Sequence, residues 1–466
     1  TIDTYDSQTV IPTNLVHHQT LVNYYTLAAG VDNPVADARG NARLSTVTRW
    51  NALNEATINL IDMTVTETLQ FDTRGNAVEQ ESVTSVYSGV ALVESSKRHI
   101  YNENIDNRGD AGTQRVTSYL IDGGIDTLVS YQVFTNRKFV DHNCVNQLVI
   151  RYDREDAGKV VLDAQEIRAS AFYSSGVAIA QDIVTFSDQT RSTILSATHV
   201  ANTDVDAQGN VKVSIVTKYS TAVISDDPTW VGGMDGSVIF SESDAIDKQT
   251  ITTTAFDTRG NALDQAIIKD SYVDGAWQFT EAMKIETDSI DLHDRALHSV
   301  IKNYSDAGMG DPSFTTMQDI NYEQYDRFGN VEKQTIDTYS SQTAIPTNLV
   351  NHQRIVNDYN LAGGADNPVA RARGNARVST VTRWNAINET TSNLIDRTVT
   401  ETLDFDLRGN AVEQASVTSV YDGVSALVES SKRHIYNESI DNRGDAGTQR
   451  GTSYLVDVGI DTLVSY

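Results

Sequence analysis

Apolar and polar residues alternate with a period of two along much of this chain. From Met63 to Phe71 most odd-numbered positions are apolar, while threonines and Gln70 occupy the positions between them. Residues 77–87 continue the alternation. Because successive side chains of a β-strand point to opposite faces of a sheet, this period predicts half-buried strands rather than helices.

The predicted strands follow one another through short turns, as in an antiparallel up-and-down meander. Further strands are predicted at 91–101, 114–121, 126–134 and 160–172. A loop is expected at 102–113, and mixed spacing of Leu, Asn and Ala predicts short helical turns within 14–30 and 51–62. We therefore expect an all-β protein whose antiparallel hairpin repeats form an elongated, coiled or tubular sheet.

A five-residue motif, Asp-x-x-Gly-Asn/Asp, separates many of these strands. An aspartate at the first position and a glycine at the fourth suit a β-turn, because the carboxylate accepts backbone N–H bonds and glycine adopts the left-handed conformation. Such a turn closes a hairpin with a bulge. The motif occurs at Asp37–Asn41, Asp72–Asn76, Asp106–Asp110, Asp206–Asn210, Asp257–Asn261, Asp326–Asn330, Asp406–Asn410 and Asp441–Asp445, and without its aspartate at Arg371–Asn375.

The clearest copies of the motif supply the residues that we expect to shape the fold. An aromatic residue precedes each of these copies. The role of the turn residues in these copies is predicted to be structural. The sequence assigns no catalytic, cofactor-binding or metal-binding residue. The structural turn residues are Asp72, Gly75, Asn76, Asp257, Gly260, Asn261, Asp326, Gly329, Asn330, Asp406, Gly409 and Asn410.

A much longer repeat contains these short motifs. Residues 1–131 return as residues 335–466, with 108 of the 131 positions identical and one inserted residue, Ser425. Residues 132–334 carry the hairpin motif in looser form and complete the long period. So faithful a period is typical of arrays, which build shape or surface rather than one active site. We interpret the chain as one continuous repeat architecture, a window on a longer protein in which the second long period is truncated.

Composition limits the partners that this chain can have. Its 466 residues carry a formal charge of −27, which argues against a nucleic-acid binder because such proteins need a basic surface. No stretch approaches the roughly 20 apolar residues of a membrane helix. A single cysteine, Cys144, excludes an internal disulfide framework. We expect an acidic, solvated surface with neither nucleic-acid binding nor membrane insertion in this segment.

The repeated unit, Tyr/Phe-Asp-x-x-Gly-Asn followed by an alternating strand, resembles the YD repeats of Rhs-type proteins. Tyr325–Asn330 is the best match to the family's Tyr-Asp-x-x-Gly-Arg, and Phe256–Asn261 is the next. Asn stands where the family usually has Arg, and Phe often replaces Tyr. The resemblance implies a giant, exported bacterial surface or secreted protein whose long β-sheet coils into a hollow shell, sometimes around a toxin.

Two tripeptides and two acidic loops suggest binding, although simpler interpretations exist. Arg108–Asp110 and Arg443–Asp445 spell the Arg-Gly-Asp cell-attachment sequence, and both also fit a hairpin turn. Asp106–Asp110 and Asp122–Asp126 offer oxygen ligands for Ca²⁺, without the spacing of an EF-hand. We expect hairpin turns, a solvated acidic surface and no cofactor, with Ca²⁺ binding as the alternative.

The histidines and the cysteine do not predict a metal or catalytic site. His17 and His18 become Asn351 and His352 in the second copy, a change that metal ligation by both histidines would not survive. Cys144 lacks the neighbouring ligands that structural zinc needs, and a small buried side chain is expected there.

No nucleophile elbow, phosphate-binding loop or dinucleotide fingerprint is present, so no enzymatic activity is expected. Our first hypothesis is an extracellular or cell-surface filament, fibre or stalk. Its partner would be itself, head to tail or as the continuation of a longer chain. The alternatives are an Rhs-like shell enclosing a cargo or toxin, and an adhesin or carbohydrate-binding array in which Trp50 and Trp384 meet sugar rings. Core packing is expected for these two tryptophans.

Overall fold

The computed structural model describes residues 1–5, 15–26, 33–230, 233–359, 367–424, 426–440, 446–457 and 460–465. Within these ranges, 26 strands belong to one antiparallel sheet and two more form a separate ribbon. The all-β meander expected from the alternation of residues is therefore confirmed. The chain divides into two compact units, which are described separately below.

Unit one comprises residues 1–265 together with 292–294. It contains one short helix, α1 (Pro34–Ala38), and 3-10 turns at Thr57–Asn59 and Glu242–Asp244. Its strands are β1 (Ile2–Tyr5), β2 (Leu15–Tyr24), β3 (Leu44–Trp50), β4 (Leu60–Phe71), β5 (Ala77–Tyr87), β6 (Leu92–Ile105), β7 (Ala111–Asp122), β8 (Ile125–Val140), β9 (Asn143–Tyr152), β10 (Val161–Ala169), β11 (Ala180–Phe186), β12 (Ile194–Val205), β13 (Val211–Tyr219), β14 (Val223–Ile224), β15 (Val238–Ile239) and β16 (Ala245–Phe256).

Unit two comprises residues 266–291 and 295–466, and β17 (Ala262–Val273) contains residues of both units. It contains one short helix, α2 (Pro368–Ala372), and 3-10 turns at Asp311–Ser313, Pro346–Asn348 and Thr391–Asn393. Its other strands are β18 (Ala276–Ile290), β19 (Ala296–Tyr304), β20 (Phe314–Tyr325), β21 (Val331–Tyr339), β22 (Leu349–Asp358), β23 (Val378–Trp384), β24 (Leu394–Phe405), β25 (Ala411–Tyr421), β26 (Leu427–Ile440), β27 (Ala446–Asp457) and β28 (Ile460–Ser465).

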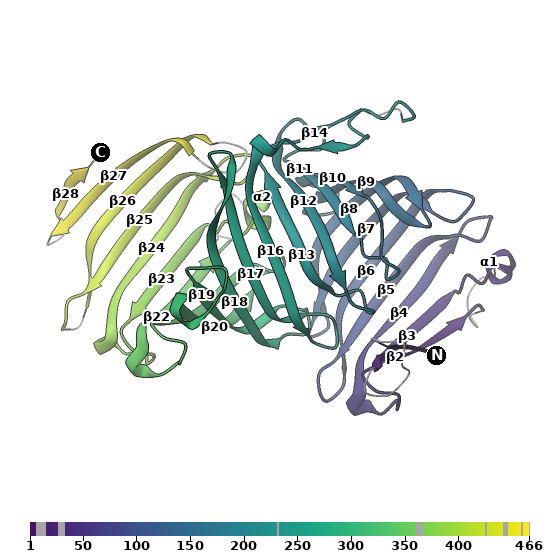
Figure 1. Ribbon diagram of the computed structural model, residues 1–466, viewed down its shortest axis with the longest axis horizontal. Helices are drawn as coiled ribbons and strands as arrows, with labels where there is room; N and C mark the ends of the chain where they lie inside the picture. The colour runs from purple at the N-terminus through teal and green to yellow at the C-terminus, as the bar shows by residue number, and fades with distance from the viewer. Residues whose placement is uncertain are drawn as a thin grey trace. The chain divides into compact units, whose positions relative to one another are not determined.

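Within each unit the strands pair with their neighbours in sequence, and Figure 1 shows them running side by side. In β4 and β5, Thr64 lies opposite Thr84, and their hydroxyl oxygens are 3.0 Å apart. Thr66 and Ser82 repeat this contact at 3.1 Å. Cross-strand pairs of this kind stabilise a sheet by roughly 0.2–1 kcal/mol each.

The two sequence repeats fold into the same elements. Helix α1 of unit one corresponds to α2 of unit two, and β4 corresponds to β24. Each short helix begins after an asparagine, Asn33 or Asn367, whose side chain accepts a hydrogen bond from the helix. The substitutions between the copies therefore leave the local fold unchanged.

The apolar core of unit one lies where the ribbon β14–β15 packs on the sheet. Ala164, Val184, Phe186 and Ala197 are buried there, together with Ala222 at the start of the ribbon. Residues of the ribbon, Ile224 and Val238 among them, pack against this cluster. The ribbon thus covers one region of the sheet, and this region also holds the charged cluster described below.

Two expectations from the sequence were wrong in detail. The loop expected at 102–113 is a tight turn, because β6 continues to Ile105 and β7 begins at Ala111. Of the range 14–30, where helical turns were expected, the structure describes residues 15–26, and these are largely strand β2, which pairs with both β1 and β3. In both cases pairing with neighbouring strands overrides weak local preferences. The short helical turn expected within 51–62 is present as the 3-10 turn Thr57–Asn59.

Candidate functional site

The motif at Asp72–Asn76 forms a hairpin turn held by the aspartate side chain. The Oδ1 atom of Asp72 accepts hydrogen bonds from the backbone N–H groups of Arg74 and Asn76, both at 2.8 Å. Its Oδ2 atom accepts from the side-chain amide of Asn76 at 2.9 Å. Burial opposes ionisation, but these hydrogen bonds prevail and lower the pKa of Asp72 below its ordinary value. Gly75 has a φ of 80°, as the turn requires.

The other predicted turn residues repeat this geometry. The first aspartate of each motif accepts from the backbone and side-chain N–H groups of the last asparagine, at distances between 2.8 and 3.0 Å. The glycines have φ values of 97°, 83° and 79° in chain order. The structure therefore gives all of them a turn-forming geometry: Asp257, Gly260, Asn261; Asp326, Gly329, Asn330; Asp406, Gly409, Asn410.

Two copies of the motif are not hairpin turns, and one lies outside the described residues. Asp37 is inside α1, and Gly40, with a φ of 76°, follows the helix end. Arg371 is likewise inside α2. The preceding Asn-Pro pair starts a helix there, so the glycine ends a helix instead of closing a hairpin. Asp441–Asp445 lies outside the part of the chain that the structure describes.

Side chains from one turn hydrogen bond to the backbone of the next turn, and we call these contacts the turn ladder. In unit one, Arg39 donates to the carbonyl oxygen of Arg74 at 2.6 Å. Arg74 in turn donates to the carbonyl oxygen of Ile105 at 2.6 Å. Asn41 donates to that of Gly75 at 2.8 Å. The turn at Asp72–Asn76 thus closes its own hairpin and is also joined to the turns on either side of it.

Unit two contains the same turn ladder. Asn375 donates to the carbonyl oxygen of Gly409 at 2.9 Å, as Asn41 does to that of Gly75. Arg408 donates to the carbonyl oxygen of Ile440 at 2.7 Å, as Arg74 does to that of Ile105. In both units, side chains of one turn thus replace water as the hydrogen-bond donors to carbonyl oxygens of the next turn.

The Arg-Gly-Asp sequence of the first copy forms a hairpin turn, as expected. The Oδ1 atom of Asp110 lies 2.8 Å from Nδ1 of His142, and Oδ2 lies 3.4 Å from a guanidinium nitrogen of Arg108. Only 9% of the Asp110 side chain is exposed. The carboxylate that an attachment sequence must present is thus occupied. Residues 443–445 lie outside the described residues.

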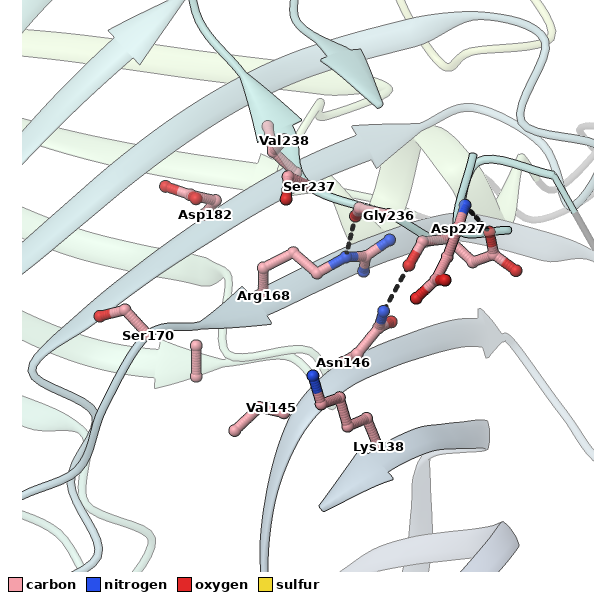
Figure 2. Close-up of a pocket in the computed structure, with 12 residues that line it drawn as sticks. Lys138, Val145, Asn146, Arg168, Ser170, Asp182, Asp227, Gly236, Ser237 and Val238 are labelled. Atoms are coloured by element: carbon pink, nitrogen blue, oxygen red, sulfur yellow. Dashed lines mark hydrogen bonds between the residues drawn. The ribbon is translucent and has the colours of Figure 1, made fainter. Parts of the chain in front are cut away.

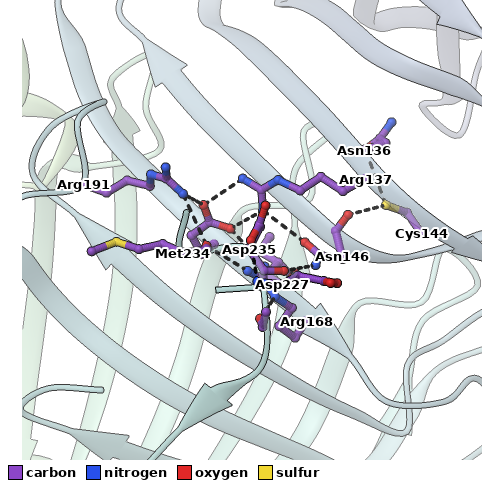
Figure 3. Close-up of polar contacts among 12 residues, drawn as sticks. Asn136, Arg137, Cys144, Asn146, Arg168, Arg191, Asp227, Met234 and Asp235 are labelled. Atoms are coloured by element: carbon purple, nitrogen blue, oxygen red, sulfur yellow. Dashed lines mark hydrogen bonds and ion pairs between the residues drawn. The ribbon is translucent and has the colours of Figure 1, made fainter. Parts of the chain in front are cut away.

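A cluster of charged side chains that the sequence analysis missed lies in unit one. The carboxylate of Glu166, on β10, is fully buried and contacts three guanidinium groups, those of Arg137, Arg168 and Arg191. The distances are 2.6, 3.0 and 2.5 Å. We call these four residues the arginine cluster, and Figure 3 shows its arginines converging from β8, β10 and the turn before β12. Burial lowers the pKa of Arg168, while Glu166 opposes that effect.

The arginine cluster holds the segment that precedes β15 against the sheet. Arg168 donates to the carbonyl oxygens of Gly236 at 2.6 Å and Met234 at 3.3 Å. Arg191 also donates to that of Met234, and Asn146 to that of Asp235. We call residues 233–237 the strap. Without the arginines, the carbonyl groups of Met234 and Gly236 would lose these hydrogen bonds to the sheet.

One histidine of each copy lies between two carboxylates. Nδ1 of His18 is 2.6 Å from Asp3, and its Nε2 is 3.3 Å from Glu55. The second copy repeats this arrangement at His352 with Asp337 and Glu389. His18 and His352 pack against Trp50 and Trp384, which are buried, so core packing of the two tryptophans is confirmed.

The pairing of His18 predicts a pH dependence of stability. The hydrogen bond to Asp3 is the main cause that raises the pKa of His18 above 6.5, and burial works against it. Stabilisation by His18 is therefore complete below pH 6.5 and lost as the pH rises through the raised value. We expect His18→Gln to destabilise unit one more at pH 5.5 than at pH 8.5, measured by urea unfolding.

A matched control for this prediction comes from the second copy. Burial lowers the pKa of His17, so its contribution has the opposite sign and is lost as the pH falls. His17→Asn reproduces the residue found at Asn351 and should not reduce stability at low pH. Equal effects of His18→Gln at both pH values would contradict the assignment.

Cys144 is half-buried, less than the sequence suggested. Its Sγ atom lies 3.3 Å from the carbonyl oxygen of Asn146, and burial raises the pKa of the thiol. A raised pKa disfavours the thiolate that nucleophilic or metal chemistry needs. Among the residues that the structure describes, no three His, Cys, Asp or Glu side chains come close enough to hold a metal ion. Within the same ranges, no helix is long and apolar enough to cross a membrane.

Comparisons with known proteins leave the family of this chain open. No family model matches it, and no curated protein matches it. The chain is similar to a solved structure titled "Crystal Structure of TcdB2-TccC3-Cdc42", with 10% sequence identity and a TM-score of 0.18. The match covers 95% of this chain and 30% of that chain, so this chain spans less than a third of its length. A likeness of this degree assigns neither a family nor a function.

Proposed function

We propose that this chain is a structural, non-catalytic β-repeat protein that builds an extracellular or cell-surface fibre. The turn ladder is the observation that carries the proposal, because the contacts of Asn41 and Arg74 that tie neighbouring turns in unit one recur at Asn375 and Arg408 in unit two. Such contacts can be repeated along an array without limit. The formal charge of −27 would keep neighbouring fibres apart.

The strand edges support growth by pairing. In unit one, β1 pairs only with β2 among the described residues. In unit two, the matching residues Ile336–Tyr339 of β21 pair on both sides, with β20 and β22. Because β1 has the same sequence as these four residues, its second edge is also compatible with pairing to another strand. Exposed strand edges recruit further strands.

Strand β28 offers an apolar edge for the same purpose. Among the described residues it pairs only with β27. Its side chains Leu463 and Val464 are 56% and 58% exposed. Whether the next strand comes from a longer chain or from another copy, we infer that it joins the sheet at β28.

Lysine substitutions at this edge test the proposal. We expect negative-stain microscopy of the chain to show filaments of constant width at high concentration. Replacing both Leu463 and Val464 with lysine should raise the concentration needed for assembly by roughly tenfold or more, because burying the exposed half of the two side chains contributes about 1.5–3 kcal/mol together. Sedimentation velocity measures the assembled fraction at each concentration.

Leu407→Lys is the matched control, since Leu407 is 97% exposed and lies in a turn instead of at a strand edge. This variant should assemble like the unmodified chain. Monodisperse particles of the unmodified chain at every concentration would refute the fibre, and closed hollow particles would favour a shell instead.

A further inference from the structure

Two adjoining cavities lie in unit one beside the strap. The smaller has a volume of about 310 Å³ and is lined by residues of β8–β10 and of the strap, as Figure 2 shows. The larger has a volume of about 610 Å³ and lies between the β8–β9 turn and residues 170–176. Val145 and Ser170 line both. Each volume is within the range of about 300–1,000 Å³ that small-molecule sites occupy.

The charges around the smaller cavity balance. Its lining includes two cationic and three anionic side chains, and Glu166 with its two other arginines lies directly behind them. The set therefore contains four charges of each sign, which favours neither a cationic nor an anionic ligand. The residues are Lys138, Arg137, Arg168 and Arg191 against Glu166, Asp182, Asp227 and Asp235.

The smaller cavity nevertheless has hydrogen-bonding capacity that the protein leaves unused. Oδ1 of Asp235 accepts from the backbone of Asp227 at 2.9 Å, but its buried Oδ2 has no partner among the described residues. Figure 2 shows Lys138, Ser170 and Ser237 on different sides of the cavity. A buried acceptor without a hydrogen-bond donor lowers stability. A ligand hydroxyl group that donates a hydrogen bond to Oδ2 of Asp235 would remove this cost.

The larger cavity adds an aromatic wall. Phe172 and Tyr173 line it together with Val140 and Val145. The phenol of Tyr173 donates to the carbonyl oxygen of Asn202 at 2.8 Å, which fixes the ring. Fixed aromatic rings offer flat apolar faces to the C–H groups of a ligand at little entropic cost.

We propose that the two cavities together bind a short, neutral saccharide. Such a ligand carries many hydroxyl donors and acceptors, no net charge, and apolar faces that stack on aromatic rings. Hydroxyl groups at one end would meet Asp235 and Lys138, and a sugar face at the other end would meet Phe172. This site goes beyond the structural role proposed above and does not depend on fibre formation.

A printed glycan array, followed by calorimetry with the free glycans that bind, tests the site on the whole chain. We expect neutral oligosaccharides among the hits, with binding weakened at least about fivefold by Phe172→Ala, the loss of one aromatic contact. Lys138→Ala should weaken the same hits. Phe279→Ala removes an exposed aromatic side chain on β18 that lines neither cavity, and should leave binding unchanged.

Each other outcome overturns the proposal. An array without neutral hits, or with anionic glycans as its sole hits, excludes the ligand class. Neutral hits that Phe172→Ala and Lys138→Ala both leave unchanged exclude the location. Circular dichroism of the variants establishes that they are folded, so that loss of binding is not loss of structure.

Discussion

Replacing Glu166 with alanine is expected to lower the free energy of unfolding of unit one by about 3–5 kcal/mol, the usual effect of removing one partner from a buried ion pair. The substitution leaves the guanidinium groups of Arg137, Arg168 and Arg191 near one another without their shared carboxylate. Their mutual repulsion, together with a cavity in β10, should release the strap. Urea unfolding measures the total effect, and hydrogen exchange of the amides at 233–237 measures the local one.

Two further variants separate charge from packing at Glu166. Glu166→Gln keeps the size of the side chain and loses its charge, and it should still destabilise unit one by about 1.5–3 kcal/mol. Glu67→Ala removes a half-exposed carboxylate that lies 3.9 Å from Arg43, and it should change stability by less than about 0.5 kcal/mol. If Glu166→Gln were as stable as the unmodified chain, the charge of Glu166 would not hold the cluster.

The hairpins could be predicted from the sequence because their causes are local. Period-two alternation sets which residues of β4 and β5 share a face, and the five residues of Asp72–Asn76 contain every side chain that closes the turn. Local signals also explain the error at Asp37–Asn41. The motif spacing is present there, but Asn33 and Pro34 start a helix before the turn can form.

The arginine cluster could not be predicted because its members meet only through the fold. Arg137 lies on β8, Glu166 on β10 and Arg191 in the turn before β12. The one local signal is the spacing of two between Glu166 and Arg168, which puts both side chains on the same face of a strand. That signal alone does not reveal that the strap covers this face.

Replacing Gly75 with alanine is expected to destabilise unit one by about 2–5 kcal/mol, for two separate reasons. A residue other than glycine at a φ of 80° costs roughly 1–2 kcal/mol. A methyl group on Gly75 would also lie 2.6 Å from the backbone nitrogen of Ala36, inside α1, and moving the helix should cost about 1–3 kcal/mol more. Urea unfolding and hydrogen exchange of the α1 amides measure the two effects.

Gly89 provides the control that isolates the effect of the contact with α1. It has a φ of 88°, but a methyl group there would meet no atom within 4 Å. Gly89→Ala should therefore cost only the roughly 1–2 kcal/mol of the backbone conformation and leave the exchange of α1 unchanged. Gly409→Ala, which would bring a methyl group 2.6 Å from Ala370 in α2, should repeat the larger loss in unit two. Equal losses of stability for Gly75→Ala and Gly89→Ala would contradict this prediction. They would mean that a methyl group on Gly75 fits beside α1 without moving the helix.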